Sequence, residues 1–170
     1  YLLQVAVENH SSIAGFSLGP LVTFRVVTAR YAEDPPVLIA GYCAIPRGQV
    51  QTNHEEYGGM VSKVNCETGR LEAAFSYTPY VEKHRQHPDT GAQIEGAQLD
   101  CWSEVVKLAL AAHASFKDVL SIGWDIVYTP QGLYLLEGNT LWGLDPGLFL
   151  GRTEYVDICL NLWQDRHVSV

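Results

Sequence analysis

The stretch 122–142, IGWDIVYTPQGLYLLEGNTLW, constrains the fold more than any other part of the chain. It contains two runs rich in β-branched and aromatic residues, Ile122–Tyr128 and Leu133–Asn139, with the turn-forming sequence TPQG between them. Such runs, bounded by turn residues, predict the two strands of a β-hairpin. Because Pro130 suits the first position of a type I turn and Gly132 the left-handed position after it, we expect a three-residue loop from one to the other.

This loop determines which side chains face each other across the hairpin. With Thr129 opposite Leu133, the pairing places Asp125 opposite Glu137. Side chains directly across a hairpin share a face, and so do residues two apart on one strand. Asp125, Glu137 and Asn139 should therefore converge on one side of the sheet. A two-residue loop would shift the register by one and put Asp125 on the opposite face, so the expectation depends on the turn.

The two acids of the hairpin repel each other unless a cation or a shared proton relieves them. Three oxygen-bearing side chains without a histidine or cysteine suit a hard ion, Mg²⁺ or Mn²⁺, rather than zinc. The alternative is an exposed hairpin face that happens to be acidic. The neighbours of the acids favour a buried sheet, where unpaired acids are costly, because they are the apolar residues Trp124, Leu135 and Leu136.

A zinc site is not indicated elsewhere in the chain. His84 and His87 lie near Asp89 in the sequence, but no further ligands follow at metal spacing, which argues against zinc.

Four more strands are predicted upstream of the hairpin. Leu21–Arg30 and Val37–Pro46 flank one polar turn, and Met60–Asn65 and Arg70–Tyr77 flank another, so that each pair predicts an antiparallel hairpin. Tyr80–Leu99 is polar and contains a proline and two glycines, which indicates a long loop.

Two helices are predicted, and together with the strands they define a fold class. The first covers roughly residues 101–119, with Asp100 as its N-cap. Its core-facing residues recur at helical spacing, namely Trp102, Val105, Val106, Ala109, Ala112 and Phe116. The second covers Thr153–Asp165. The expected fold is therefore α+β, a mostly antiparallel sheet with helices packed on one face.

Charge and cysteine content exclude several classes of function. The chain has 170 residues, with eleven basic against nineteen acidic ones and a net charge of −8, which argues against nucleic acid as the main partner. No apolar run approaches the length of a membrane span. The cysteines are far apart and form no C-x-x-C motif, which indicates reduced thiols in a cytoplasmic protein rather than disulfides. They are Cys43, Cys66, Cys101 and Cys159.

The motif GWD…LLEGN resembles the C-terminal metal-binding hairpin of the ATP-grasp enzymes, and in particular that of the sugar-transferase-associated branch. Four other stretches agree with the family in order and spacing. TFRVVT at Thr23–Thr28 is similar to the arginine-bearing strand, and TNHEEYGG at Thr52–Gly59 to the Asn-x(n)-Gly-Gly turn. VNCETGRL at Val64–Leu71 is similar to the hairpin after that turn, and HPDTGAQIEG at His87–Gly96 to the loop before the long helix. The resemblance extends to about Asp145.

This resemblance implies an ATP- and Mg²⁺-dependent ligase that joins a small-molecule carboxylate to an amine or thiol through an acyl phosphate. Two Mg²⁺ ions (or Mn²⁺) would bridge the phosphates, with Glu137 shared between them and Asp125 and Asn139 holding one each. Arg25 and Arg47 would stabilise the transferring phosphoryl group. The residues implied to contact the nucleotide are Gln4, Asn53, Gly58 and Gly59.

Several of these residues have a second interpretation. Arg25 lies inside an apolar strand and could instead form an ion pair at the edge of the core. Arg47 could be a solvated turn residue, and a plain glycine turn would also explain Gly58 and Gly59.

The start of the chain, Tyr1–Val7, is strand-like and is similar to the hinge strand where ATP-grasp proteins hold the adenine between two lobes. We therefore expect residues 1–170 to be the C-terminal portion of an ATP-grasp domain, with the N-terminal nucleotide-binding lobe upstream of residue 1. Such a portion should be inactive by itself. The alternative to a ligase is a non-catalytic nucleotide- or metal-binding module, or a structural module in polysaccharide biosynthesis.

Overall fold

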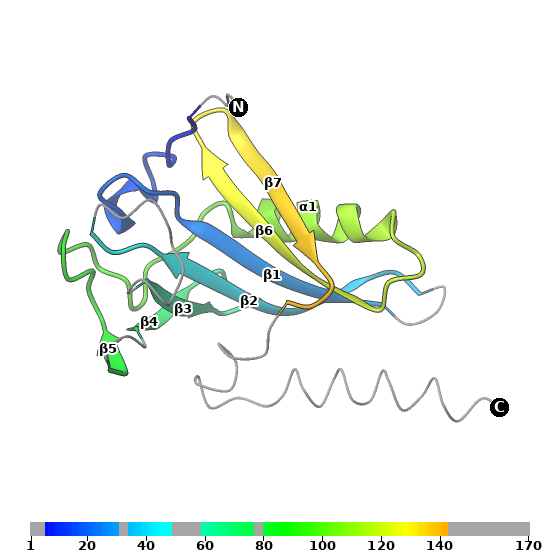
Figure 1. The fold of residues 1–170 in the computed structure, drawn as a ribbon, viewed down its shortest axis with the longest axis horizontal. Coiled ribbons are helices and arrows are strands. Elements are labelled where there is room, and N and C mark those ends of the chain that lie inside the picture. Colours follow the sequence, from blue (N-terminus) through cyan, green and yellow to red (C-terminus); the bar gives the residue numbers. More distant parts are fainter. Residues whose placement is uncertain (1–5, 31–33, 49–58, 77–79, 143–170) are drawn as a thin grey trace.

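The computed structural model describes residues 6–30, 34–48, 59–76 and 80–142 (Figure 1). Within them, seven strands form one antiparallel sheet in the order β5-β4-β3-β2-β1-β6-β7. The strands are β1 (Thr23–Ala29), β2 (Val37–Ile45), β3 (Met60–Val64), β4 (Leu71–Ser76), β5 (Glu82–His84), β6 (Ser121–Thr129) and β7 (Gly132–Asn139). A short 3₁₀ turn, η1 (Ala14–Phe16), precedes β1.

One face of the sheet is covered by the helix α1 (Trp102–Ala114), which runs along β1, β2, β6 and β7 (Figure 1). The main core lies between them, because every second residue of the central strands points toward the helix. Phe24 and Val26 of β1 and Ile126 of β6 are fully buried there with Val105 of α1. Burial of each such side chain contributes about 1.5–3 kcal/mol. The predicted α+β architecture is confirmed.

The other face of the sheet carries the alternate residues of the same strands. A smaller apolar cluster lies there, with Val27, Ala40, Tyr42 and Val61 buried and Trp142 packed against them. Because side chains alternate along a strand, Arg25 and Asp125 belong to this second face.

The helix is shorter than its sequence pattern predicts. It ends at Ala114, where the amide of Ser115 donates to the Ala112 carbonyl and the amide of Phe116 donates to the His113 carbonyl, which closes the last turn. Phe116 therefore lies beyond the helix and is 49 % exposed, so its predicted place in the core is wrong. The predicted N-cap is also wrong, because Cys101 occupies that position and its side chain makes no capping hydrogen bond.

The polar stretch Tyr80–Leu99 contains more structure than a plain loop. Residues Glu82–His84 form β5 against β4, and isolated bridges join Gln86 to Gln93 and Arg70 to Gln98. At the start of the described chain, Ala6 and Val7 belong to no strand. The rest of the predicted strand Tyr1–Val7 and the helix predicted over Thr153–Asp165 lie outside the described residues. No helix in the described ranges is long and apolar enough to cross a bilayer.

Candidate metal site

A row of polar residues crosses the second face of the sheet, one from each of five neighbouring strands. Arg25 on the central strand β1 lies opposite Tyr42 of β2 on one side and Asp125 of β6 on the other. Tyr42 in turn lies opposite Lys63 of β3, and Asp125 lies opposite Glu137 of β7. Residues directly opposite share a face, so all five side chains project from the same side. We call these residues the polar row.

The β6–β7 hairpin reaches this register by a different route from the one that its sequence predicts. Thr129 pairs with Gly132, so the loop has two residues and the predicted three-residue loop is wrong. A bulge corrects the shift, because Ile126 pairs with Leu135 and Asp125 with Glu137, which leaves Leu136 as the extra residue. The shorter loop and the bulge cancel, and Asp125 and Glu137 share a face as expected.

Asp125 is held by a two-pronged contact with Arg25. The Arg25 Nε donates to Asp125 Oδ1, and its Nη2 donates to Oδ2 at 2.8 Å. A third donor, Nη1, reaches the backbone oxygen of Trp142 at 3.2 Å. Arg25 is therefore an ion-pair residue, and its partner is one of the predicted metal ligands rather than a remote acid.

Glu137 brings a second negative charge to Asp125. Burial raises the pKa of the Asp125 carboxyl above its ordinary range, Arg25 lowers it through hydrogen bonds and charge, and the hydrogen-bonding contact and charge of Glu137 raise it again. Asn139 completes the group, because its Nδ2 donates to Glu137 Oε1 at 2.8 Å. The structure thus brings together all three side chains of the predicted metal site.

The glycines of the GWD and EGN sequences make room for two tryptophans. A Cβ on Gly138 would lie 2.6 Å from the ring of Trp124, and a Cβ on Gly123 would lie 2.4 Å from the Cβ of Trp142. Trp124 packs on the helix side of the sheet, whereas Trp142 packs on the side of the polar row. The two glycines allow the tryptophans to cover the sheet on either side of Asp125.

Trp124 is fixed in turn by two residues that sequence reasoning did not single out. Its Nε1 donates to Thr28 Oγ1 at 2.9 Å, and Thr28 Oγ1 lies 2.7 Å from His113 Nδ1. The other ring nitrogen of His113 lies 3.0 Å from the carbonyl oxygen of Val119, so it carries the proton. The helical spacing of His113 from Val105 and Ala109 was the available signal that this histidine is buried.

The donor set suits a hard divalent cation. Asp125, Glu137 and Asn139 offer only oxygen ligands, and with Arg25 as the counter-charge the two carboxylates retain one net negative charge. The described residues contain no group of three or more histidines, cysteines, aspartates or glutamates that could hold a metal by themselves. Mg²⁺ usually completes its shell with water and substrate phosphates, so two carboxylates and an amide are sufficient.

The other predicted ligands are only partly described. Arg47 lies 3.7 Å from the carboxylate of Asp89, and the amide of Gly48 donates to the same side chain at 2.8 Å. Gly59 is buried immediately before β3. The remaining ones, Gln4, Asn53 and Gly58, lie outside the described residues.

His84, at the end of β5, and His87, in the loop after it, have structural contacts that explain them without zinc. His87 is fully buried, with Nε2 2.9 Å from the Pro46 carbonyl oxygen and Nδ1 accepting from the amides of Asp89 and Thr90. His84 lies 2.9 Å from Ser76 Oγ through its Nε2. His87 thus fixes the loop that carries Asp89, the partner of Arg47.

The described part of the chain is thus an α+β domain with one antiparallel sheet, and its β6–β7 hairpin carries an acid–acid–amide group beside an arginine. The chain belongs to the sugar-transfer associated ATP-grasp family, whose family model matches residues 1–151. This match confirms the resemblance seen in the sequence. No curated protein and no solved structure shows a significant match to the chain.

Proposed function

We propose that this chain supplies the metal- and phosphate-binding face of an ATP- and Mg²⁺-dependent carboxylate–amine or carboxylate–thiol ligase. The observation that carries the proposal is the placement of Asp125, Glu137 and Asn139 beside Arg25 on one face of the sheet. Family membership supports ATP and Mg²⁺ as the cofactors. In this proposal residues 1–170 form the C-terminal portion of the domain.

Each residue of the group has a role that follows from its contacts. Glu137 contacts both Asp125 and Asn139, which supports the role that the family resemblance implies for it, in which it would be the carboxylate shared by two ions. Asp125 is oriented by two bonds from Arg25, which aligns its oxygens before any ligand arrives. Mg²⁺ would neutralise charge on the phosphates during transfer.

Arg25 can serve both the carboxylate and a phosphate. Its contacts to Asp125 and Trp142 use three of the five N–H groups of a guanidinium. The remaining donors and the positive charge would stabilise a phosphoryl group bound at the adjacent metal site. Substrates in this proposal are a small-molecule carboxylate, activated as an acyl phosphate, and the amine or thiol that attacks it.

One observation favours the alternative of a non-catalytic nucleotide- or metal-binding module. Arg25 already neutralises Asp125, so the group is electrostatically tolerable without a metal. A retained but inactive site would look similar in its protein contacts. The two proposals differ in turnover, which the following experiment measures.

The test uses the longer protein that we expect to contain this chain. ADP formation from ATP is measured with Mg²⁺ and with a mixture of small carboxylates and amines, for the wild type, Glu137→Gln and the matched control Asp118→Asn. Glu137→Gln should lose most ADP formation without a fall in melting temperature, whereas the control should keep it. Wild-type turnover in Glu137→Gln would contradict the bridging role, and Mg²⁺-dependent ATP binding without ADP formation in the wild type would favour the non-catalytic module.

A further inference from the structure

Two aromatic residues of β6 pack on the helix side of the sheet, across the strand from the candidate metal site. One is Trp124, directly before Asp125, and the other is Tyr128, near the tip of the β6–β7 hairpin. Both belong to the main core, because residues an even number apart on a strand share a face. The two rings differ in how tightly they are enclosed and in how close they lie to the carboxylates.

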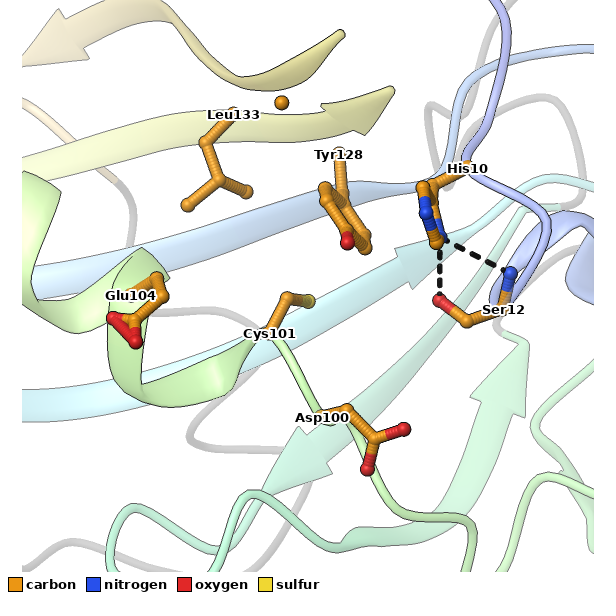
Figure 2. Close-up of a pocket in the computed structure, with 8 residues that line it drawn as sticks. His10, Ser12, Asp100, Cys101, Glu104, Tyr128 and Leu133 are labelled. Carbon is orange, nitrogen blue, oxygen red and sulfur yellow. Dashed lines mark hydrogen bonds between the residues drawn. The ribbon is translucent and has the colours of Figure 1, made fainter. Parts of the chain in front are cut away.

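The ring of Tyr128 lies beside open space. The His10 amide donates to the Tyr128 carbonyl at 2.9 Å, and the two rings stack with centroids 4.0 Å apart. Figure 2 shows both rings at the wall of a cavity of about 460 Å³, which Leu133 also lines. A shift of the Tyr128 ring into this space need not displace the strand that carries it.

The ring of Trp124 is enclosed on all sides by comparison. The residue is 3 % exposed, and Gly138 is its direct partner in the β6–β7 ladder. A Cβ on Gly138 would lie 2.6 Å from the Trp124 ring, so the ring lies directly on the backbone of β7. Closely packed groups transmit displacements to their neighbours. Movement of the Trp124 ring would therefore move β7 against β6 at this point.

This contact is adjacent to both carboxylates of the candidate metal site. Asp125 follows Trp124 on β6, and it pairs with Glu137, which precedes Gly138 on β7. The bulge at Leu136 comes next, and a bulge changes the direction in which nearby side chains project. The separation of the two carboxylates therefore depends on where the Trp124 ring lies.

A single hydroxyl group holds this ring in place. The Nε1 of Trp124 donates to Thr28 Oγ1 at 2.9 Å, and Thr28 Oγ1 lies 2.7 Å from His113 Nδ1. Because Nε2 of His113 donates to the Val119 carbonyl, Nδ1 accepts from the Thr28 hydroxyl. Thr28 and His113 are fully buried. Loss of the hydroxyl would thus leave the indole N–H without its partner inside the core, which is costly.

The hydroxyl has a second acceptor within reach. Thr28 Oγ1 lies 3.4 Å from the carbonyl oxygen of Ile122, its ladder partner on β6. In a protein without His113, the hydroxyl can donate to Ile122 and still accept from Trp124. No such substitute exists for the hydroxyl itself in the hydrogen-bond chain from Trp124 to His113. Thr28 should therefore matter more than His113 for the position of the Trp124 ring.

We propose that Thr28 is a positioning residue of the metal site and that His113 supports it. The Thr28 hydroxyl fixes the Trp124 ring, and the ring fixes the separation of Asp125 and Glu137. The inference rests on the proposed function, because it requires these two carboxylates to be metal ligands. Partners that bond a metal ligand directly change metal affinity about 10–100-fold. Thr28 acts through one further residue, so its effect should be smaller.

The test measures the Mn²⁺ affinity of the 170-residue chain from the broadening of the Asp125 and Glu137 amide signals. Thr28→Val keeps the shape of the side chain without its hydroxyl and should weaken binding about five-fold. Thr28→Ser keeps the hydroxyl and should bind as the wild type does. His113→Leu should weaken binding about two-fold, because the Ile122 carbonyl serves as the second acceptor. Unchanged affinity in Thr28→Val, or an equal loss in Thr28→Ser, would overturn the proposal.

A metal-free measurement supplies the control. Carbon NMR of the Asp125 and Glu137 carboxyl groups, without Mn²⁺, should show changed shifts in Thr28→Val. The shifts should be unchanged in His10→Ala, which removes the ring that stacks on Tyr128. Equal changes in both variants would mean that any disturbance of β6 reaches the carboxylates, and the specific role of Thr28 would be wrong.

The two measurements separate this inference from the proposed function. Wild-type Mn²⁺ binding at the two carboxylates without a response to Thr28→Val would overturn the positioning role alone. Absence of Mn²⁺ binding there in the wild type would contradict the proposed function, and the carboxyl shifts would still decide whether Thr28 positions the two side chains. If Thr28→Val does not fold, His113→Leu decides, since a two-fold loss supports the proposal and an unchanged affinity contradicts it.

Discussion

Asp125 lies directly opposite Glu137 across the β6–β7 ladder, although the turn that joins their strands is one residue shorter than the sequence predicts. The bulge at Leu136 restores the pairing that the short turn would have broken. The opposition of the two acids therefore depends on two local irregularities at once. If only one of the two were present, Asp125 and Glu137 would project from opposite faces, and the candidate metal site would not exist.

The contact between the two acids should appear in the titration of Asp125. Its pKa is raised from the ordinary value of 3.8 by burial and by Glu137, against the lowering effect of Arg25. Glu137→Gln removes one raising charge, so the pKa of Asp125 should fall. Carbon NMR of the carboxyl groups measures the change. An unchanged or higher pKa in the variant would show that Glu137 does not act on Asp125.

The same shift predicts a direction for the pH dependence of stability. A carboxyl whose pKa is higher in the folded state binds protons more readily there than in the unfolded chain. Asp125 therefore contributes fully to the free energy of unfolding below pH 3.8, the ordinary pKa of its carboxyl. This contribution is lost as the pH rises through the higher pKa that the carboxyl has in the folded state. In Glu137→Gln this loss should be smaller. Urea unfolding of the wild type and the variant at a series of pH values gives the difference.

Gly138→Ala should destabilise the pairing of β6 with β7 at the point where the Trp124 ring packs against Gly138. The added Cβ would meet the Trp124 ring at 2.6 Å, and overpacking of this kind costs about 1–3 kcal/mol. The matched control is Gly15→Ala, where the nearest atom lies at an ordinary 3.5 Å. Denaturant unfolding should separate the two variants clearly. Equal stabilities would mean that Trp124 can move aside at little cost.

Replacement of Arg25 should show whether its forked geometry matters. Arg25→Lys keeps the charge but cannot supply two parallel bonds to Asp125. Arg25→Gln also removes the charge and leaves a half-buried carboxylate beside Glu137, at a cost of about 1–3 kcal/mol. We expect stability in the order wild type, Arg25→Lys, Arg25→Gln, measured by urea unfolding. A lysine variant as stable as the wild type would show that charge alone is sufficient.

Much of the fold could be predicted from the sequence, because alternation and turn residues mark strands strongly. The starts and ends of β1, β2, β3 and β6 fall within two residues of expectation. Fine details were harder to predict. The start and end of α1 depend on local hydrogen bonds at Cys101 and Ser115 rather than on the apolar period. Similarly, β5 forms because it pairs with β4, and the local sequence of this polar stretch does not show that pairing.

The residues of the candidate site could be predicted from the sequence, but the contacts between them could not. The grouping of Asp125, Glu137 and Asn139 follows from face alternation once the register is known. The bulge at Leu136 has no mark in the sequence, since leucine is an ordinary strand residue. The sequence allows two interpretations of Arg25, because only the pairing of β1 with β6 shows that its partner is Asp125. The polar row, which also includes Tyr42 and Lys63, needs the order of five strands.

The isolated 170-residue chain should bind ATP and Mg²⁺ only weakly and should not turn ATP over. Phosphoryl transfer relies on positioning and electrostatic stabilisation from both sides of the nucleotide, and we propose that this chain supplies one side. Calorimetric titration with ATP and Mg²⁺ measures the affinity. Micromolar binding by this chain alone would contradict our proposal that a further lobe is required.

The most direct test of the central claim is a titration of the chain with Mn²⁺, followed by paramagnetic broadening of amide signals. Mn²⁺ takes the same hard oxygen ligands as Mg²⁺ and broadens the signals of nearby residues. We predict that Asp125, Glu137 and Asn139 broaden first and that Glu137→Gln abolishes this effect, while Asp118→Asn leaves it intact. Broadening centred on Asp100 and Glu104 instead, or unchanged in Glu137→Gln, would contradict the assignment of the metal site.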